Sequence, residues 1–258
     1  MNKKYFFFDI DGTLLRYNQG NVFFPESTKL AIQKLHEQGH FIAIATGRSY
    51  PLAKPTMDLL DIHHMVSDGG NGITINDELI DVMPLDHKKC VELIEECNKK
   101  GYAWGIAPEI SNRRFVPDLR FFELTNSVYM KDIVIENLDL NDYEKIYKVF
   151  IACLPEEEKQ LEKTKGLHCC RYTKEFFIIE PMDKMVGISR MMKHLGASLK
   201  DMVVFGDGEN DCTMFSDQWI SIAMGNACDV LKEKATFVTK TLEEDGVYYA
   251  CKHFGWIE

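Results

Sequence analysis

Two short acidic segments, far apart in the chain, hold the residue types that could do chemistry. Residues 9–13 read Asp-Ile-Asp-Gly-Thr, and residues 206–211 read Gly-Asp-Gly-Glu-Asn-Asp. Two carboxylates separated by one residue leave an extended strand on the same side, so their charges repel and favour a bound cation. If both segments meet in one cleft, the gathered negative charge needs a hard divalent cation, for which Mg²⁺ is the natural candidate. The candidate carboxylates are Asp9, Asp11, Asp207 and Asp211.

Other chemistry fits these segments less well. An EF-hand loop starting at Asp9 needs Asp or Asn at its fifth position, where Thr13 stands, and Glu at its twelfth, where Gly20 stands. The second segment begins like a dinucleotide-binding Gly-x-Gly, but Asp211 occupies the place of the third glycine. A solvated turn at the end of a strand is the plain structural alternative, because Asp and Gly favour turns.

Donors suited to a phosphoryl group occur at two further places. Thr46 and Gly47 follow an apolar run, and Lys184 opens a helical pattern. A hydroxyl, a backbone N–H and an ammonium group are what phosphoryl oxygens need. Taken singly, each residue has an ordinary explanation as a cap, a turn or a solvated side chain. Together with the acidic segments, they indicate a site that handles phosphate.

Alternating strand and helix patterns at both ends of the chain predict the elements that position these residues. We expect an α/β fold with a doubly wound, Rossmann-like parallel sheet. Ligands of such sheets bind beyond the carboxyl ends of the strands, which is where both acidic segments fall. The short apolar runs that predict the strands are Tyr5–Ile10, Phe41–Ala45, Met65–Ser67, Met202–Phe205 and Trp219–Ala223.

The middle of the chain has a pattern of its own. About 100 residues suffice for an independent α+β domain. We therefore predict a core domain made of residues 1–81 and 182–258, with a cap domain inserted at residues 82–181. Inside the insertion we expect a helix across Cys90–Cys97 with Asp86 as its N-cap, a helix over Glu156–Lys165, and strands at Tyr147–Cys153 and Phe176–Glu180.

Length and composition exclude several function classes. The chain has 258 residues, a formal net charge of −10 and a pI near 5.3, which disfavours a general binder of nucleic-acid phosphates or anionic membranes. Its eight cysteines show no Cys-x-x-Cys spacing, so reduced and mostly buried thiols are expected. No segment approaches the ~20 apolar residues of a membrane helix. We expect a cytoplasmic protein whose partner is a small molecule, neither nucleic acid nor membrane, and the sequence carries no signal of its oligomeric state.

Two other clusters could bind a metal. Residues 36–40 read His-Glu-Gln-Gly-His and match the zinc-hydrolase pattern His-Glu-x-x-His. Zinc would need both histidines on one helical face, but Gly39 is expected to end the helix and His40 to lead into the next strand. His168, Cys169 and Cys170 have no second cluster to complete a tetrahedral set, so strand packing is the better interpretation.

The motifs, in their order along the chain, resemble those of a known family. Residues 9–13, Thr46, Lys184 and residues 206–211 are similar to the four motifs of the haloacid dehalogenase-like superfamily. The insertion between the second and third motifs resembles the large α/β cap, type IIB, of the Cof-type phosphatases. Further matches are Asn71-Gly72, Ala223-Met224-Gly225-Asn226-Ala227 and Glu244-Asp245-Gly246-Val247.

The resemblance implies a phosphoryl-transfer mechanism. Asp9 would be the nucleophile that forms an aspartyl-phosphate, and Asp11 the general acid and then the general base. Mg²⁺ would be held by the Asp9 carboxylate, the Asp11 carbonyl and Asp207. Asp211 would orient metal-bound waters. The residues expected to bind the phosphoryl group are Thr46, Gly47, Lys184 and Asn210.

The expected activity is hydrolysis of small phosphorylated metabolites, such as sugar phosphates. Asp11 favours phosphatases and phosphomutases within the superfamily, so a phosphomutase is one alternative and a non-enzymatic sugar-phosphate sensor is another. Cap residues would set specificity. Arg113, Arg114 and Arg120 could bind a second anionic or sugar group, although an exposed face beside a core strand is the more ordinary explanation. Arg48 could reach the substrate or form a structural ion pair.

Overall fold

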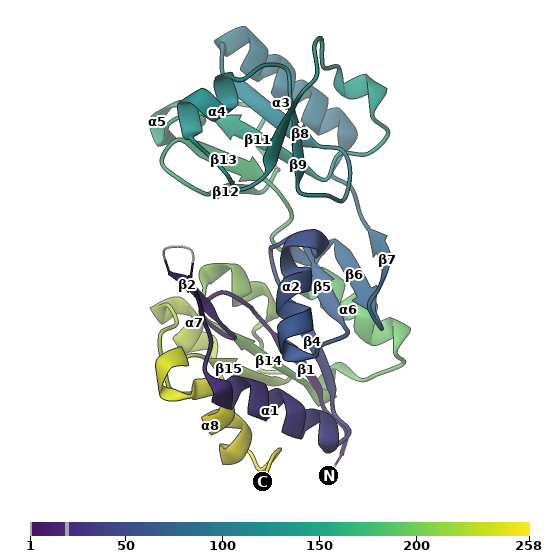
Figure 1. Cartoon of the computed structure of the whole chain (residues 1–258), viewed down its shortest axis with the longest axis vertical. Coiled ribbons are helices and arrows are strands. Elements are labelled where there is room, and N and C mark those ends of the chain that lie inside the picture. Colours follow the sequence, from purple (N-terminus) through teal and green to yellow (C-terminus); the bar gives the residue numbers. More distant parts are fainter. Residues whose placement is uncertain (1, 19–20) are drawn as a thin grey trace. The chain divides into compact units, whose positions relative to one another are not determined.

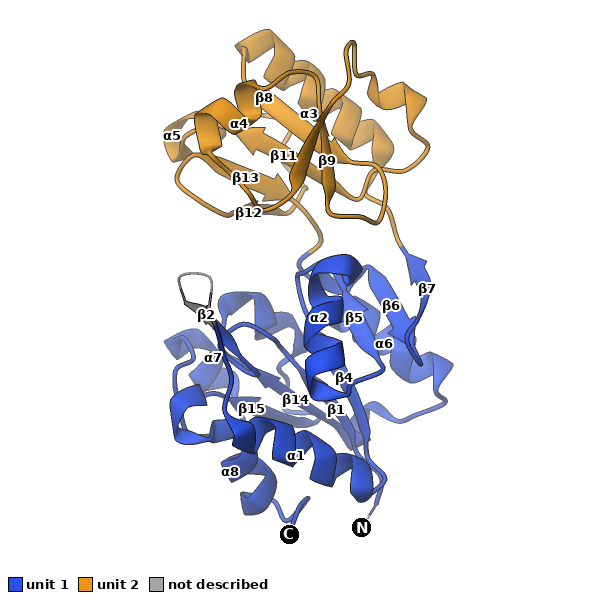
Figure 2. Cartoon of the chain, in the orientation of Figure 1, with its two compact units in different colours: residues 1–82, 182–258 blue, residues 83–181 orange. Residues whose placement is uncertain are grey.

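The computed structural model describes residues 2–18 and 21–258. It divides into two compact units, one of residues 1–82 with 182–258 and one of residues 83–181 (Figure 2). The catalytic and specificity roles that we expect for these units stay predictions. In the described part of the chain, no helix is long and apolar enough to cross a bilayer.

The first unit contains an eight-stranded sheet in the order β16-β15-β14-β1-β4-β5-β6-β7 (Figure 1). Strands β16 to β5 in this order run parallel, and β6 and β7 add an antiparallel hairpin. The two ends of the chain therefore build one sheet, as predicted. The strands are β1 Tyr5–Phe8, β4 Phe41–Ala45, β5 Met65–Ser67, β6 Gly72–Ile75, β7 Glu78–Val82, β14 Met202–Gly206, β15 Ile220–Ala223 and β16 Phe237–Val238.

Helices cover both faces of this sheet, which confirms the doubly wound α/β class. On one face α1, α2 and α8 pack against Phe6 and Phe8 of β1, and on the other α6 and α7 pack with Phe7. Alternate residues of β1 thus point into two apolar clusters, as a strand buried on both sides requires. The helices are α1 Glu26–Glu37, α2 Tyr50–Leu60, α6 Lys184–His194, α7 Asp229–Lys234 and α8 Gly246–His253.

Short elements complete the first unit. They are the hairpin β2 Arg16–Asn18 with β3 Asn21–Phe23 and the 3₁₀ turns η1 Asp68–Gly70, η3 Leu199–Asp201, η4 Glu209–Met214 and η5 Leu242–Glu244. The first strand is shorter than the predicted range Tyr5–Ile10. It ends at Phe8, so Asp9 lies directly beyond it.

The second unit contains a six-stranded sheet in the order β10-β9-β8-β11-β13-β12. Helix α3 (His87–Lys100) begins at the expected cap, where the Asp86 side chain accepts a hydrogen bond from Lys89 N at 3.1 Å. The buried face of α3 packs on one side of the sheet, and Phe121 of α4 (Arg120–Thr125) packs on the other. The remaining elements are β8 Ala103–Ala107, β9 Arg113–Val116, β10 Lys131–Val134, β11 Lys148–Ala152, β12 Cys169–Arg171, β13 Phe176–Ile179, α5 Pro155–Glu158 and η2 Leu140–Asp142.

Three local expectations need correction. The helix predicted over Glu156–Lys165 is only the short α5, and beyond it the Glu96 carboxylate accepts the backbone N–H groups of residues 162 and 163. Arg114 does not lie on an exposed face, because its side chain is fully buried between two aromatic rings. The eight cysteines are free thiols as expected, but half of them are only partly buried.

Candidate active site

The carboxyl ends of three neighbouring strands gather the candidate residues. Strand β1 pairs with β14 on one side and with β4 on the other, so Phe8 lies beside Phe205 and Ile44. Asp9 N donates to Phe205 O at 3.0 Å, which continues the pairing one residue past the strand. Residues 206–211 and Thr46 therefore flank Asp9, although they are distant in the chain.

An acidic cluster forms at this edge. Asp9, Asp207 and Asp211 each place a carboxylate oxygen within 4.8 Å of the others. Asp9 and Asp211 are buried, and Asp207 is partly exposed. The Asp211 carboxylate also folds its own loop, because its Oδ2 accepts hydrogen bonds from Asp207 N at 2.9 Å and from Gly208 N at 3.0 Å.

Lys184 lies within this cluster. Its side chain is only 1% exposed, and Nζ lies 2.5 Å from Asp9 Oδ1 and 2.6 Å from Asp211 Oδ1. The ammonium group therefore neutralises one charge of the cluster and orients two carboxylates. It also leaves the second oxygen of Asp9 outside that ion pair.

Two glycines allow the first turn of α6 to bring Lys184 to this place. Gly70 has a φ of +114°, and a Cβ there would lie 2.1 Å from Asp183 O. A Cβ on Gly187 would lie 2.5 Å from Gly70 O. Asp183 caps the helix by accepting a hydrogen bond from Met185 N. The loop after β5 and the start of α6 therefore pack backbone to backbone.

The crowded charges shift the protonation of the site. Burial and the neighbouring Asp211 raise the pKa of Asp9 to about 8, although Lys184 opposes this rise. Burial and Asp211 raise the pKa of Asp207 to about 6. Burial alone would lower the pKa of Lys184, but Asp211 and Asp9 hold it above its ordinary value, so Lys184 stays charged. The cluster holds more negative charge than its one ammonium group neutralises.

The Asp11 carboxylate lies apart from the acidic cluster. Arg48 contacts both of its oxygens, with Nε 2.9 Å from Oδ2 and Nη2 2.5 Å from Oδ1. The expectation of four converging carboxylates therefore becomes three that converge and one that pairs with arginine. The Asp11 side chain is more than half exposed, which leaves it accessible to a ligand.

The phosphate-binding candidates occupy different environments. Thr46 is buried, its Oγ1 accepts from Arg48 N at 3.1 Å, and its backbone carbonyl accepts from Gly69 N. Gly47 is half-buried beside it, whereas Asn210 is exposed on η4. Thr46 and Lys184 therefore occupy fixed positions at the strand ends, and Asn210 lies at the surface of the acidic loop.

Three close contacts to Asp207 were missed from the sequence. Thr13 Oγ1 donates to Asp207 Oδ1 at 3.4 Å, and Asn226 Nδ2 donates to Asp207 Oδ2 at 3.3 Å. Gly12 has a φ of +87°, and a Cβ there would lie 2.1 Å from Asp207 Oδ2. Thr13 and Asn226 belong to two of the sequence motifs, residues 9–13 and 223–227. A motif does not reveal which atoms a side chain contacts, so their bonds to Asp207 could not be predicted.

The residues present fit a hard divalent cation. Carboxylate oxygens are the ligands that Mg²⁺ prefers. Burial and the neighbouring Asp211 raise the pKa values of Asp9 and Asp207 even though Lys184 opposes the rise, so a further positive charge would stabilise both carboxylates. Asp211 Oδ1 pairs with the Lys184 ammonium group, and Asp211 Oδ2 accepts two backbone N–H groups. Each oxygen of Asp207 accepts only one neutral donor, and the second oxygen of Asp9 lies outside the ion pair with Lys184. Asp9 and Asp207 are thus better placed than Asp211 to ligate a metal directly.

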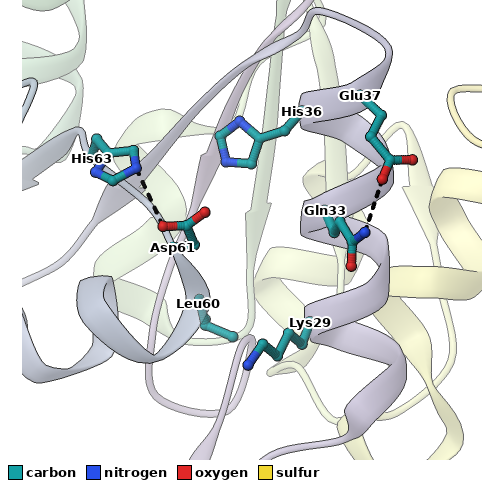
Figure 3. Close-up of a pocket in the computed structure, with 7 residues that line it drawn as sticks. All are labelled: Lys29, Gln33, His36, Glu37, Leu60, Asp61 and His63. Atoms are coloured by element: carbon teal, nitrogen blue, oxygen red, sulfur yellow. Dashed lines mark hydrogen bonds and ion pairs between the residues drawn. The ribbon is translucent and has the colours of Figure 1, made fainter.

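The segment that matches the zinc pattern, residues 36–40, does not have the geometry of a zinc site. Helix α1 ends at Glu37, Gly39 is left-handed, and His40 is buried where its Nδ1 accepts from Lys4 N. His36 and Glu37 instead face a hollow whose other wall carries Asp61 and His63 (Figure 3). Among residues 2–18 and 21–258, one group of three or more His, Cys, Asp or Glu side chains lies close enough together to share a metal ion. This group is the acidic triad of Asp9, Asp207 and Asp211.

Similarity to known proteins agrees with the resemblance of the motifs. A model of the haloacid dehalogenase-like hydrolase family matches residues 6–251. Along its full length the chain is 31% identical to "Putative phosphatase YkrA" of Bacillus subtilis (strain 168), which is also covered completely. It is 26% identical to 5-amino-6-(5-phospho-D-ribitylamino)uracil phosphatase YitU of the same organism, with 95% of each chain covered. The solved structure of the HAD subclass IIB sugar phosphatase BT4131 aligns with a TM-score of 0.76 at 28% identity, covering 99% of this chain and 100% of that chain.

Proposed function

Because the chain belongs to the haloacid dehalogenase-like hydrolase family, as a Cof-type phosphatase, we propose that it is a Mg²⁺-dependent phosphatase of small phosphorylated metabolites. The observation that carries the proposal is the position of Asp9, which is buried at the strand ends with one oxygen held by Lys184 and with Asp207 and Asp211 beside it. This arrangement suits a carboxylate that attacks phosphorus.

The proposed reaction has two displacements at phosphorus. In the first, a carboxylate oxygen of Asp9 forms a bond to phosphorus while the bond to the ester oxygen breaks, and Asp11 gives its proton to the departing alcohol. In the second, Asp11 takes a proton from water, whose oxygen bonds to phosphorus as the bond to Asp9 breaks. Inorganic phosphate leaves, and Asp9 returns to its carboxylate form.

The surrounding residues would manage charge during these steps. A phosphate monoester dianion is repelled by an unshielded aspartate, so the ammonium group of Lys184 lowers the barrier by neutralising Asp9 and the transferring oxygens. Thr46 and Gly47 would donate to those oxygens from the end of β4, and Asn210 from the acidic loop. Bound Mg²⁺, held by Asp9, Asp207 and the Asp11 carbonyl, would supply further charge neutralisation at the phosphoryl group.

The names of two relatives support a proposal for the substrate class. BT4131 is named as a sugar phosphatase, and YitU as a phosphatase of a phosphoribitylamino compound. Both names describe phosphate esters of small polyhydroxylated molecules. We therefore propose a sugar phosphate or a similar polyhydroxylated phosphomonoester as the substrate of this chain.

The test is phosphate release from a panel of such esters. We expect one inorganic phosphate per ester consumed with Mg²⁺, and no turnover with EDTA or in Asp9→Asn. Asp58→Asn, which removes an exposed carboxylate of α2, is the matched control and should keep wild-type rates. A sugar monophosphate converted to its isomer with little phosphate release would indicate a phosphomutase instead. Binding of phosphorylated metabolites without turnover of any ester would indicate a sensor.

A further inference from the structure

The loop after β15 runs beside the acidic loop of the site. Strand β15 pairs with β14 so that Ala223 lies beside Gly206. Beyond the strands the pairing continues, because Met224 N donates to Gly206 O at 3.0 Å and Cys228 N donates to Asp207 O at 2.9 Å. Residues 224–228 therefore follow the backbone that carries Asp207.

The side chain of Asn226, which lies on this loop, links three other segments of the chain. Its Nδ2 donates to Gly12 O at 2.9 Å and to Asp207 Oδ2 at 3.3 Å, and its Oδ1 accepts from Leu242 N at 3.0 Å. One half-buried amide thus links the turn after β1, the carboxylate after β14 and the start of η5. Each polar atom of the side chain has a partner.

The support behind Asn226 leaves its backbone little freedom. Gly225 N donates to Lys240 O at 2.9 Å, and a Cβ on Gly225 would lie 2.6 Å from Thr241 N. Thr239 Oγ1 in turn donates to Gly246 O at 2.7 Å. This bond joins the two ends of residues 239–246, the segment that packs against Gly225. The amide is therefore held from behind by residues 239–246 while it faces Asp207 and Gly12.

Asp207 is held in one orientation by contacts with Asn226, Thr13 and Gly12. Asp207 Oδ1 accepts from Thr13 and Oδ2 from Asn226, and the carboxylate lies against the Cα of Gly12. Each oxygen receives one neutral donor, which fixes its direction without neutralising its charge. A carboxylate accepts more hydrogen bonds or ligands than these two, so Asp207 retains lone pairs for a cation. A neutral partner of this kind orients a metal ligand, and its loss typically weakens metal affinity.

We propose that Asn226 is a positioning residue that holds Asp207 against the turn at Gly12 and so sets the affinity of the site for Mg²⁺. The inference rests on the proposed function, because it takes the acidic triad as the metal site. In this role Asn226 acts through its hydrogen bond to Asp207 and is not itself a metal ligand.

The experiment measures Mg²⁺ binding directly, by titration calorimetry on the full chain without substrate. Asn226→Leu keeps much of the side-chain volume and removes all three hydrogen bonds, and Asn226→Ala removes the volume as well. Gln33→Ala removes an exposed amide of α1 and is the matched control. The melting temperature in EDTA reports whether each variant is folded.

We expect the Mg²⁺ dissociation constant to rise about 10- to 100-fold in both Asn226 variants and to stay unchanged in the control. Added Mg²⁺ should restore much of kcat, and KM for the ester should change little. A purely structural role would lower the melting temperature in EDTA but leave the Mg²⁺ dissociation constant at the wild-type value, and that result would overturn the inference. A wild-type chain that binds no Mg²⁺ and hydrolyses no ester would instead contradict the proposed function.

Discussion

Lys184 in the first unit and Arg114 in the second unit are both buried cations, and they are neutralised in different ways. Lys184 in the first unit lies between the carboxylates of Asp9 and Asp211, at 2.5 and 2.6 Å. Arg114 in the second unit has one carboxylate, with Nε 2.6 Å from Asp132 Oδ1, and its guanidinium lies 3.9 Å from the ring centre of Phe121. Among the described residues, Nη1 and Nη2 of Arg114 have no hydrogen-bond partner.

The difference teaches that burial of a charge does not by itself identify a functional site. Arg114 belongs to the core of its unit, where a ring face and one carboxylate offset its desolvation. Lys184 lies where three strand ends meet, and the acids around it exceed what it can neutralise. Several converging groups with shifted pKa values, rather than one buried cation, are the mark of a site.

The largest effect is expected when the cation of the first unit is removed. Lys184→Met should lower kcat by at least about 100- to 1,000-fold, because the ammonium group that shields Asp9 is lost. It should also destabilise the metal-free fold, since two buried carboxylates lose their partner. Steady-state phosphate release and thermal melting in EDTA measure the two effects. Lys193→Met, in the last turn of the same helix, is the control, and a Lys184→Met enzyme with near-wild-type kcat would break the comparison.

Disruption of the buried pair in the second unit should affect stability and not catalysis. Asp132→Asn leaves the Arg114 guanidinium uncompensated and should cost about 3–5 kcal/mol of unfolding free energy. The double variant Arg114→Met with Asp132→Leu should recover most of this loss, because an apolar pair suits that cluster. Urea unfolding measures both. A loss of kcat in the folded double variant would show that Arg114 serves the reaction and is not only a core residue.

A half-buried cation, Arg48, should give an intermediate effect. Arg48→Met releases the Asp11 carboxylate, and a misplaced general acid should lower kcat by up to about 100-fold. The loss should be greatest for alkyl phosphates, whose leaving group needs a proton, and smallest for p-nitrophenyl phosphate. Rates on both esters, with Arg16→Met as a control in another exposed ion pair, measure this. An equal loss on both esters would argue against a role through Asp11.

The smallest effect is a pH dependence of stabilisation by Mg²⁺. Because the fold raises the pKa of Asp207 to about 6 and of Asp9 to about 8, it favours their protonated forms. The resulting stability is present below the unfolded value of 3.8 and is lost as pH rises through 6 and then 8. Binding of Mg²⁺ to these two carboxylates would displace the protons, so the melting-temperature gain from Mg²⁺ should grow between pH 5.5 and pH 8.5.

Each additional 1 kcal/mol of Mg²⁺ binding should raise the melting temperature by about 2–4 °C in a chain of this size. Melting curves with Mg²⁺ and with EDTA at both pH values give the difference. Asp207→Asn should flatten the dependence in the range near pH 6. A gain that is equal at both pH values would show that no proton is displaced.

The sequence predicted the parts of the fold and site that depend on local pattern. The apolar runs located β1, β4 and β14, and their parallel pairing follows from the alternation of strands and helices. The positions of Asp9 and residues 206–211 at the strand ends then follow from the sheet itself. The class of fold could thus be predicted because the period of the apolar residues and the alternation of strands and helices can both be read along the sequence.

Tertiary partners could not be predicted in the same way. The pairing of Arg48 with Asp11 depends on how two loops meet, and the burial of Arg114 depends on the aromatic rings that α4 and β11 bring to it. Glu96, which lies on another helix, holds the backbone of residues 162 and 163 beyond α5. These features depend on side-chain contacts between distant segments, on which the local sequence carries no signal.

The bonds of Asp211 have a consequence for how a metal would arrive. Its carboxylate accepts two backbone N–H groups of its own loop and the ammonium group of Lys184, so the loop is already closed before any ion enters. Little conformational entropy would then remain to be lost on binding of a metal ion. The rate of loading would be governed by the release of water from the ion, because Mg²⁺ dehydrates reluctantly.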